Sequence, residues 1–537
     1  MLTIAPAPPA RYLYAGAIAL LIAAGCLVRS SGVLPVPLDF WADEAWWATL
    51  LATGEFTQFG FRPPGYMWLC RALLAIGDAE LWLRLPSLLA GCAALYCLYR
   101  SAELSTHSRA AVLFVTLLAA FHPKLVVFAK EFKPYSVEVS VFAALTLWTL
   151  RLRHAGSNRS RAGLIAAAVV AVPFCYPVVF LYPGIAFALF GQKLALLRRL
   201  STRQWVYGLL LALTVLALVH FVTYEMLGAG ASRLLWGAKY DVFPIGTDLP
   251  GAVAWYAQKT YQLIALAGEL NRMPVAGTFL FGAAYATGLA LLVRSKRWNE
   301  LALFAGPLVM ALAANLLGYW PYGAFRANLF LVPGTILVAA QAVDWAASRQ
   351  WGRQTAYGAL ALMLLAATVD GPEIYRSKHS AHWAAAPQLT AVVADIARRS
   401  RNEGSAWTDV ILADWHSWRP ILYYLPRAPE LQQRARLVAG PVADLAALEA
   451  RLAGEIDRAV ADRRPTRLWL VVTRLDSHAG IRRGAAVAKH AVYQREFATG
   501  DRDYHPMLIE LRVAAPADLL PAAARRYDPR PRAIRAS

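Results

Sequence analysis

Long apolar runs separated by short polar segments occupy the first 370 residues of the chain. A run of about 20 apolar residues is long enough to cross the hydrocarbon core of a bilayer as an α-helix. The pattern therefore predicts an α-helical polytopic membrane protein with about 11 transmembrane helices. The expected spans cover residues 12–28, 82–100, 109–128, 134–152, 162–180, 178–192, 204–223, 274–293, 300–319, 327–346 and 354–370.

Prolines interrupt one of these apolar regions. The segment "PFCYPVVFLYPG" carries three prolines within residues 173–184. Each proline removes a backbone donor and its ring clashes with the preceding helical turn. We therefore expect either a broken pair of spans or a re-entrant hairpin at this place. Residues 224–272 are interpreted as a long loop.

From residue 371 onward the apolar runs become shorter and charged residues become frequent. "DVILADW" and "RLWLVVTRLD" are typical of buried strands, and "PQLTAVVADIARRSR" and "PVADLAALEARLAGEIDRAVADR" of amphipathic helices. Strands that alternate with helices predict a small α/β domain. The expected organisation is a transmembrane domain at residues 1–370, an α/β domain at 371–520 and a disordered tail at 521–537.

The short loops indicate the orientation of the spans. "RLRHAGSNRSR", "GQKLALLRRLSTRQ", "RSKRWNE" and "SRQWGRQ" are rich in Arg and Lys, and such loops lie in the cytoplasm of membrane proteins. This places the N-terminus inside and everything after residue 371 outside. We therefore predict a multi-pass protein whose C-terminal domain lies outside the cytoplasmic membrane.

Composition supports a membrane protein. The chain has 537 residues, of which 58% are hydrophobic, and a net charge of +20. In a membrane protein this charge reflects cytoplasmic loops and sites for anionic lipid phosphates, so we expect no nucleic-acid partner. All five cysteines lie in apolar stretches of the first third, which predicts no structural disulfide and no zinc knuckle.

A carboxylate pair, Asp43 and Glu44, follows the first apolar run in "LDFWADEAWWATLLATGEF". The aromatic residues Trp46 and Trp47 are typical of the membrane interface, where a lipid-linked substrate presents its headgroup. A carboxylate there is a candidate general base for an acceptor hydroxyl, or a candidate ligand for a divalent cation such as Mg, Mn or Ca. The alternative is an acidic first turn of a solvated helix.

A second cluster, "FHPKLVVFAKEFKPYSVEV", places Lys130, Glu131, Lys133 and Tyr135 at the mouth of a span. Lysines that alternate with a carboxylate suit a phosphate-binding site in which the carboxylate orients the lysine side chains. The alternative is a positively charged collar whose side chains extend toward the interface.

Two further arginines lie at predicted span entries. In "GYWPYGAFRANLFLVPG", Arg326 is about to enter the membrane, where it needs an anionic partner from the protein or from a lipid phosphate. The alternative is a helix-start Arg paired with a local carboxylate. In "FRPPGYMWLCRALLAIGDAELWLRLPS" the double proline gives a rigid, extended entry. Arg62 is a candidate to face substrate, and Arg84 is interpreted as an anchor.

Together these segments resemble the bacterial GT-C glycosyltransferases, the relatives of protein O-mannosyltransferases and of the lipid A aminoarabinose transferase. "DEAWW" and "RPPGYMWLCRALLAIGDAELWLRLPSLLAG" are similar to their first outer loop, "FAKEFKPYSVEV" to their second and "YWPYGAFRANLFLVPG" to a late span. Two positions depart from the family pattern: Arg62 stands where the family usually has His, and Lys133 where it usually has Arg. Lysine lacks the bidentate fork of arginine.

The resemblance implies a polyprenyl-phosphate-linked sugar donor, a lipid, glycan or protein acceptor, and transfer with inversion. It makes Asp43 the base or a metal ligand. The residues it implicates are Asp43, Glu44 and Glu131 in catalysis and Arg62, Lys130, Lys133, Tyr135 and Arg326 in binding substrate and phosphate. Two other classes stay open on the residues: a polyprenyl-linked glycolipid flippase or transporter, and a non-catalytic envelope assembly protein. A transporter predicts charges in mid-span, whereas here they gather at the span mouths.

Overall fold

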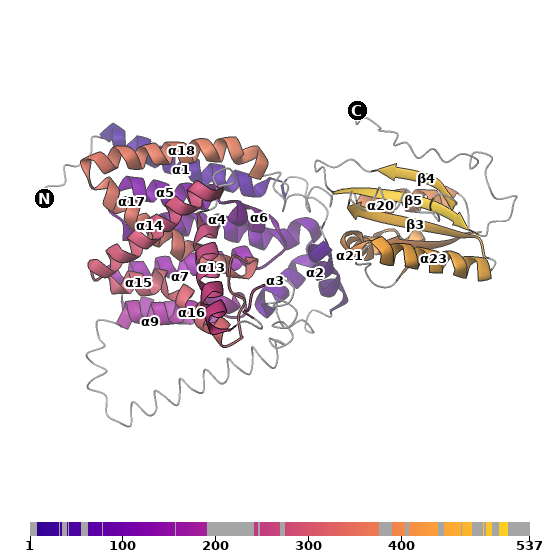
Figure 1. The fold of residues 1–537 in the computed structure, drawn as a ribbon, viewed down its shortest axis with the longest axis horizontal. Helices are drawn as coiled ribbons and strands as arrows, with labels where there is room; N and C mark the ends of the chain where they lie inside the picture. The colour runs from indigo at the N-terminus through magenta and orange to yellow at the C-terminus, as the bar shows by residue number, and fades with distance from the viewer. Residues whose placement is uncertain are drawn as a thin grey trace, which may run out of the picture. The chain divides into compact units, whose positions relative to one another are not determined.

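The computed structural model divides into two compact units. Met1–Pro35 with Glu55–Ile374 form one, here the helical unit, and Val36–Gly54 with Tyr375–Ser537 form the other, here the mixed unit (Figure 1). The inclusion of 36–54 in the mixed unit is not anticipated by the sequence pattern. The structure describes residues 8–31, 33–34, 40, 42–54, 63–77, 79–155, 157–190, 241–244, 248–268, 274–374, 389–402, 407–438, 445–462, 464–474, 487, 490–496 and 504–513.

Helices form nearly all of the described helical unit (Figure 1). They are α1 Pro8–Ser30, α3 Pro64–Leu74, α4 Ala79–Ser105, α5 Arg109–Phe121, α6 Pro123–Lys130, α7 Tyr135–Ala155, α8 Asn158–Ala171, η2 Tyr176–Leu181, α9 Tyr182–Phe190, α13 Leu249–Ala267, α14 Pro274–Arg294, α15 Trp298–Phe304, α16 Gly306–Leu316, η5 Arg326–Leu331, α17 Val332–Ala347 and α18 Gln350–Ile374.

Three described helices are long and apolar enough to cross a membrane, namely Tyr12–Ser30, Ala79–Ser105 and Arg326–Ala347. Two bent pairs, α5 with α6 and α15 with α16, raise the number to five if each pair is one span. The prediction of a polytopic helical protein is thus confirmed in its coarse form. The count of about 11 spans stays a prediction, and the expected span 204–223 lies outside the described residues.

Prolines account for the breaks. The 45° bend between α5 and α6 lies at His122, directly before Pro123, and the 49° bend between α15 and α16 lies just before Pro307. The predicted break near residues 173–184 is observed, because α8 ends at Ala171 and the 3-10 helix η2 follows. Helix α13, in contrast, lies inside the segment interpreted from the sequence as a long loop.

Close packing holds α14 against α17. A Cβ added at Gly288 in α14 would lie 2.0 Å from the carbonyl oxygen of Val338 in α17. Small residues at helix interfaces allow such close approach of two backbones, which is how helices associate within lipid. Arg29 stabilises another contact: its buried guanidinium donates to the carbonyls of Ala119, at 2.5 Å, and Ala120, at 2.8 Å. Both carbonyls belong to the last turn of α5, where a cation also complements the helix dipole.

The mixed unit contains a five-stranded sheet in the order β2-β1-β3-β5-β4. Strands β2 (Ala435–Leu437), β1 (Thr408–Ala413) and β3 (Thr466–Arg474) are parallel to one another. Strands β5 (Tyr504–Val513) and β4 (Ala491–Glu496) extend the sheet in antiparallel register. The prediction of a small strand-containing C-terminal region is confirmed. The tail 521–537 lies outside the described residues.

Helices cover both faces of this sheet because alternate strand residues point to opposite sides. On one face Leu468 and Leu470 join a buried cluster with residues of α23 (Leu445–Asp462). On the other face Trp469 and Val471 join a cluster with residues of α20 (Leu389–Asn402) and α21 (Trp415–Tyr424). The mixed unit also includes α2 (Ala42–Thr53), which packs against α21.

Candidate active site

The segment from Lys130 to Tyr135 joins α6 to α7 in the helical unit and carries four of the predicted site residues. Pro134 ends this irregular stretch directly before α7 begins. Lys130 (9% exposed), Glu131 (3%) and Lys133 (2%) are all buried. Burying three charged residues within four positions costs free energy unless each charge is paired. The stretch is therefore a candidate binding site and not a solvated collar.

Hydrogen bonds fix this segment in place. The Nζ of Lys130 donates to Ser31 Oγ at 2.8 Å, at the end of α1. The backbone N–H of Lys133 donates to the Glu131 carbonyl at 2.8 Å. The Lys133 carbonyl in turn accepts from Ser87 Oγ of α4, at 2.7 Å. These bonds hold the conformation of the segment between α6 and α7.

The first predicted motif meets the second at this point. The Tyr66 hydroxyl, in the helix that follows the double proline, lies 3.3 Å from Ser87 Oγ. The Tyr66 ring also stacks on Phe132, with centroids 6.1 Å apart. "RPPGY" and "KEFKPY" are thus adjacent in space, although nearly seventy residues separate them in sequence. Arg62 itself lies outside the described residues.

Arg326 approaches the same segment from the late part of the chain. It begins η5, which packs against α7, and its Cζ lies 5.9 Å from the centroid of the Tyr135 ring. The loop before it is held by Asn328, whose amide donates to the carbonyls of Pro321, at 3.0 Å, and Gly323, at 2.9 Å. The helical unit therefore groups Lys130, Glu131, Lys133, Tyr135 and Arg326 around the entry to α7.

The sequence analysis did not identify Asp241 and Lys259, which support this loop. Lys259 Nζ lies 2.7 Å from Asp241 Oδ2, and Trp255 Nε1 donates to Asp241 Oδ1 at 2.9 Å. Burial raises the pKa of the Asp241 carboxyl, but the hydrogen bonds from Lys259 and Trp255 outweigh this effect and lower the pKa below its ordinary value. The carbon chain of Lys259 also packs against Gly323, whose φ is +115°. No motif at these positions marks them in sequence.

Asp43 lies in the first turn of α2 within the mixed unit, whereas Glu131 belongs to the helical unit. Asp43 forms an ion pair with Arg419 of α21, whose Nη1 is 3.4 Å from Asp43 Oδ1. The Arg419 guanidinium also lies 4.1 Å from the centroid of the Trp46 ring. Glu44, the next residue, is fully buried. No sequence motif connects Arg419 with the first loop.

Two features make the Asp43 environment chemically distinctive. Burial lowers the pKa of Arg419, and the Asp43 carboxylate opposes this shift. Tyr424 accepts a hydrogen bond from the backbone N–H of Phe40, at 2.7 Å, and so fixes the chain just before α2. The Asp43 carboxylate is therefore held in a defined position beside a cation, within a segment that the Tyr424 bond fixes.

The described residues do not provide a cluster of ligands for a divalent cation. No group of three or more His, Cys, Asp or Glu side chains converges in the ranges that the structure describes. Asp43, the predicted candidate ligand, instead faces the cationic Arg419. These residues therefore do not assemble a ligand set, and a role for a metal stays a prediction.

Residues 61–222 match the family model described as dolichyl-phosphate-mannose-protein mannosyltransferase. The match begins just before the "RPPGY" turn and includes the segment Lys130–Tyr135. It confirms the resemblance to GT-C glycosyltransferases predicted from the sequence, and with it the enzyme class. The comparison with curated proteins finds no match.

Several solved structures resemble the chain at low sequence identity. ArnT from Cupriavidus metallidurans, in a structure bound to undecaprenyl phosphate, is 14% identical, with a TM-score of 0.48 over 94% of this chain and 99% of that one. The Archaeoglobus fulgidus oligosaccharyltransferase in its apo form is 12% identical, with a TM-score of 0.46 over 93% and 75%. Arabinofuranosyltransferase AftD from Mycobacteria is 15% identical, with a TM-score of 0.37 over 93% and 41%.

Proposed function

We propose that this membrane glycosyltransferase moves a sugar from a polyprenyl-phosphate donor to a hydroxyl group of an envelope lipid, glycan or protein, with inversion at the anomeric carbon. The donor class is supported by the family model, whose description names dolichyl-phosphate mannose, a polyprenyl-phosphate sugar. The site residues support it independently, because they provide the charges that such a donor needs.

The observation that carries the proposal is the grouping of three cations at the entry to α7. Lys130 and Lys133 are buried there, and Arg326 lies against Tyr135 from a distant part of the chain. Lys130, Lys133 and Arg326 outnumber Glu131 in this group, and positive charge of this kind is suited to binding a phosphate. Cations aimed at a phosphate also stabilise the charge that it gains as the sugar departs.

The transfer itself needs one proton acceptor. The acceptor oxygen forms a bond to the anomeric carbon, while the bond from that carbon to the phosphate oxygen breaks. The bonding electron pair leaves with the phosphate, where Lys130, Lys133 and Arg326 stabilise it. The proton of the attacking hydroxyl goes to a carboxylate, and we assign this role to Asp43, which the ion pair with Arg419 holds in place. Glu44 and Glu131 remain candidates for orienting the reacting groups.

Binding of the donor lipid tests the proposal. We expect Arg326→Ala to weaken binding of a polyprenyl phosphate to the purified protein by about tenfold or more, since a charge-assisted hydrogen bond contributes about 1.5–3 kcal/mol. The matched control is Arg159→Ala, an exposed arginine at the start of α8. Equal affinities of Arg326→Ala and wild type, with unchanged melting temperatures, would reject the phosphate site.

Asp43→Asn tests the proton acceptor separately. The substitution keeps the shape of the side chain and removes its charge. We expect turnover to fall by about a hundredfold or more while donor binding stays at the wild-type level. Normal turnover in this variant would reject the assignment of Asp43, even if the phosphate site holds.

A further inference from the structure

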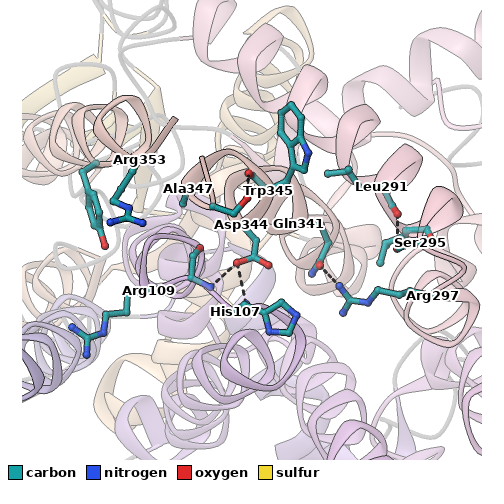
Figure 2. Close-up of a pocket in the computed structure, with 14 residues that line it drawn as sticks. His107, Arg109, Leu291, Ser295, Arg297, Gln341, Asp344, Trp345, Ala347 and Arg353 are labelled. Carbon is teal, nitrogen blue, oxygen red and sulfur yellow. Dashed lines mark hydrogen bonds between the residues drawn. The ribbon is translucent and has the colours of Figure 1, made fainter. Parts of the chain in front are cut away.

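A cavity of about 610 Å³ lies in the helical unit beside α5, α14, α17 and α18 (Figure 2). None of the residues that line it belongs to the donor-binding segment. Arg326 begins the candidate span Arg326–Ala347, and Ala347, at the other end of that span, lines the cavity. The cavity and the proposed donor site are therefore at opposite ends of one helix.

Three candidate spans end or begin at this cavity. The span Ala79–Ser105 ends just before His107, which lines it, and the bent span of α5 and α6 begins at Arg109, which also lines it. The span Arg326–Ala347 ends there as described above. Apolar segments end where the hydrocarbon core meets the headgroups. The cavity thus lies at headgroup level.

Positive charge dominates the cavity wall. Arg109, Arg297 and Arg353 line it, and Figure 2 shows Asp344 between Arg297 and the other two. The Asp344 carboxylate accepts from the backbone N–H groups of His107, at 3.0 Å, and of Ser108. It is therefore committed to the start of α5, where the helix dipole favours an anion.

Two other described acids lie nearby, Glu103 and Glu300, and both are paired with arginines; Glu103 pairs with Arg100, which does not line the cavity, at 2.6 Å. Glu300 pairs with Arg297 at 3.3 Å and with Arg153 at 2.8 Å, so it is shared between two arginines. Arg297 also donates to Gln341 Oε1 at 2.7 Å. Within the described ranges no ion pair involves Arg353, which is exposed. An excess of positive charge is left for an anion from outside.

The same cavity has an apolar part. Leu291 and Leu292 of α14 line it, as do the aromatic residues Trp345 and Tyr357. Each of these two aromatic side chains is 43% exposed. Trp and Tyr are enriched at membrane interfaces because their rings contact both apolar chains and headgroups. Such a wall fits a ligand that carries an anionic group and an acyl chain together.

We propose that this cavity binds the phosphate group of an anionic glycerophospholipid, with Arg109 and Arg353 as its main contacts. Inorganic phosphate offers the same anionic chemistry, but it leaves the exposed Trp345 and Tyr357 without an apolar partner. Guanidinium groups suit the site because they form paired hydrogen bonds to phosphate oxygens. The site is separate from the donor site and does not depend on the proposed transfer reaction.

The test is native mass spectrometry of the purified full-length protein with phosphatidylglycerol and with phosphatidylcholine. We expect wild type to retain phosphatidylglycerol about tenfold or more over phosphatidylcholine, since each arginine near anionic lipid contributes about 1 kcal/mol. The double variant Arg109→Gln/Arg353→Gln should lose this preference. The control variant Arg151→Gln/Arg159→Gln, which removes two exposed arginines outside the cavity, should keep it.

Three outcomes would overturn the proposal. One is an unchanged preference in the double variant, and another is equal retention of the two lipids by wild type. The third is displacement of the lipid by inorganic phosphate at low millimolar concentration, which would identify free phosphate as the ligand. If the double variant does not fold, Gln341→Glu provides a second reading, because it adds a carboxylate to the wall without removing an arginine. Unchanged retention in that variant also overturns the proposal.

Discussion

At the scale of single residues, Arg419 and Asp43 illustrate how a site residue depends on a distant partner. The two are separated by 376 positions in sequence and form an ion pair at 3.4 Å. Arg419 also stacks on Trp46, which holds its guanidinium beside the carboxylate. We regard Arg419 as a positioning residue, because it contacts both the Asp43 carboxylate and the Trp46 ring.

Replacing Arg419 should change the pH dependence of turnover. A neighbouring cation favours the ionised form of a carboxylate, so its loss makes Asp43 easier to protonate. We expect the acidic limb of the pH–rate profile of Arg419→Gln to move toward higher pH, with a smaller change in KM. The control is Arg458→Gln, whose side chain is 58% exposed on α23. An acidic limb that stays in place, with activity lost at every pH, would mean that Arg419 is only structural.

The pair Asp241 and Lys259 predicts a stability effect at low pH. The folded-state pKa of Asp241 is lower than its ordinary value of 3.8, so the unfolded state binds more protons as the pH falls. The contribution is therefore complete above about pH 4 and is lost as the pH falls through the lower, folded-state pKa. Because the Asp241 side chain is 69% exposed, solvent screening keeps the effect small.

The measurement is the melting temperature of wild type and Asp241→Asn from pH 6 down to pH 3. We expect the wild type to be more stable at pH 6 and the two proteins to converge near pH 3. A difference that grows as the pH falls would contradict the sign of this pKa shift.

At the scale of elements, α14 and α17 show how backbone approach determines packing. Gly288 has no room for a Cβ because the Val338 carbonyl oxygen lies 2.0 Å from that position. We expect Gly288→Ala to destabilise the protein by about 1–3 kcal/mol, the usual cost of overpacking a core. The measurement is the midpoint of thermal unfolding in detergent.

Gly282 of the same helix is the matched control. No atom lies within 4 Å of the position that its Cβ would take. Gly282→Ala should therefore stabilise α14 slightly, because alanine has the higher helix propensity by about 1 kcal/mol. Equal effects of the two substitutions would show that propensity and not packing determines them.

The elements also show what a sequence reveals. Strands β1 and β3 are predictable because "DVILA" and "RLWLVV" are continuous apolar runs of strand length. Strand β4, "AVYQRE", is not, since its polar residues hide the alternation. Helix α13 was interpreted as loop because its polar residues, among them Lys259, interrupt the apolar pattern. Lys259 nevertheless forms the ion pair with Asp241.

At the scale of the whole molecule, local sequence motifs indicate candidate site residues but do not show which distant segments pack together. "KEFKPY" and "RPPGY" are recognisable because each places proline, a basic residue and tyrosine within six positions. The packing of α2 on α21 is not predictable in this way. It depends on contacts between Phe40 or Asp43 and residues more than 370 positions later, and no local pattern encodes such a pair.

The orientation of the chain is the last prediction, and it connects the proposed donor site with the proposed lipid cavity. Basic loops lie in the cytoplasm, and the loop 151–161 carries four arginines, whereas the C-terminal region follows an odd number of predicted spans. We expect alkaline phosphatase fused after residue 537 to be active and green fluorescent protein at that position to be dark. Fusions after Arg159 should give the reverse result, since that loop is expected inside.

The donor segment would then face outward and the cationic cavity inward, where anionic lipids add negative surface potential. Active phosphatase after Arg159 would invert this assignment, and activity at both positions would mean that the spans between them are miscounted.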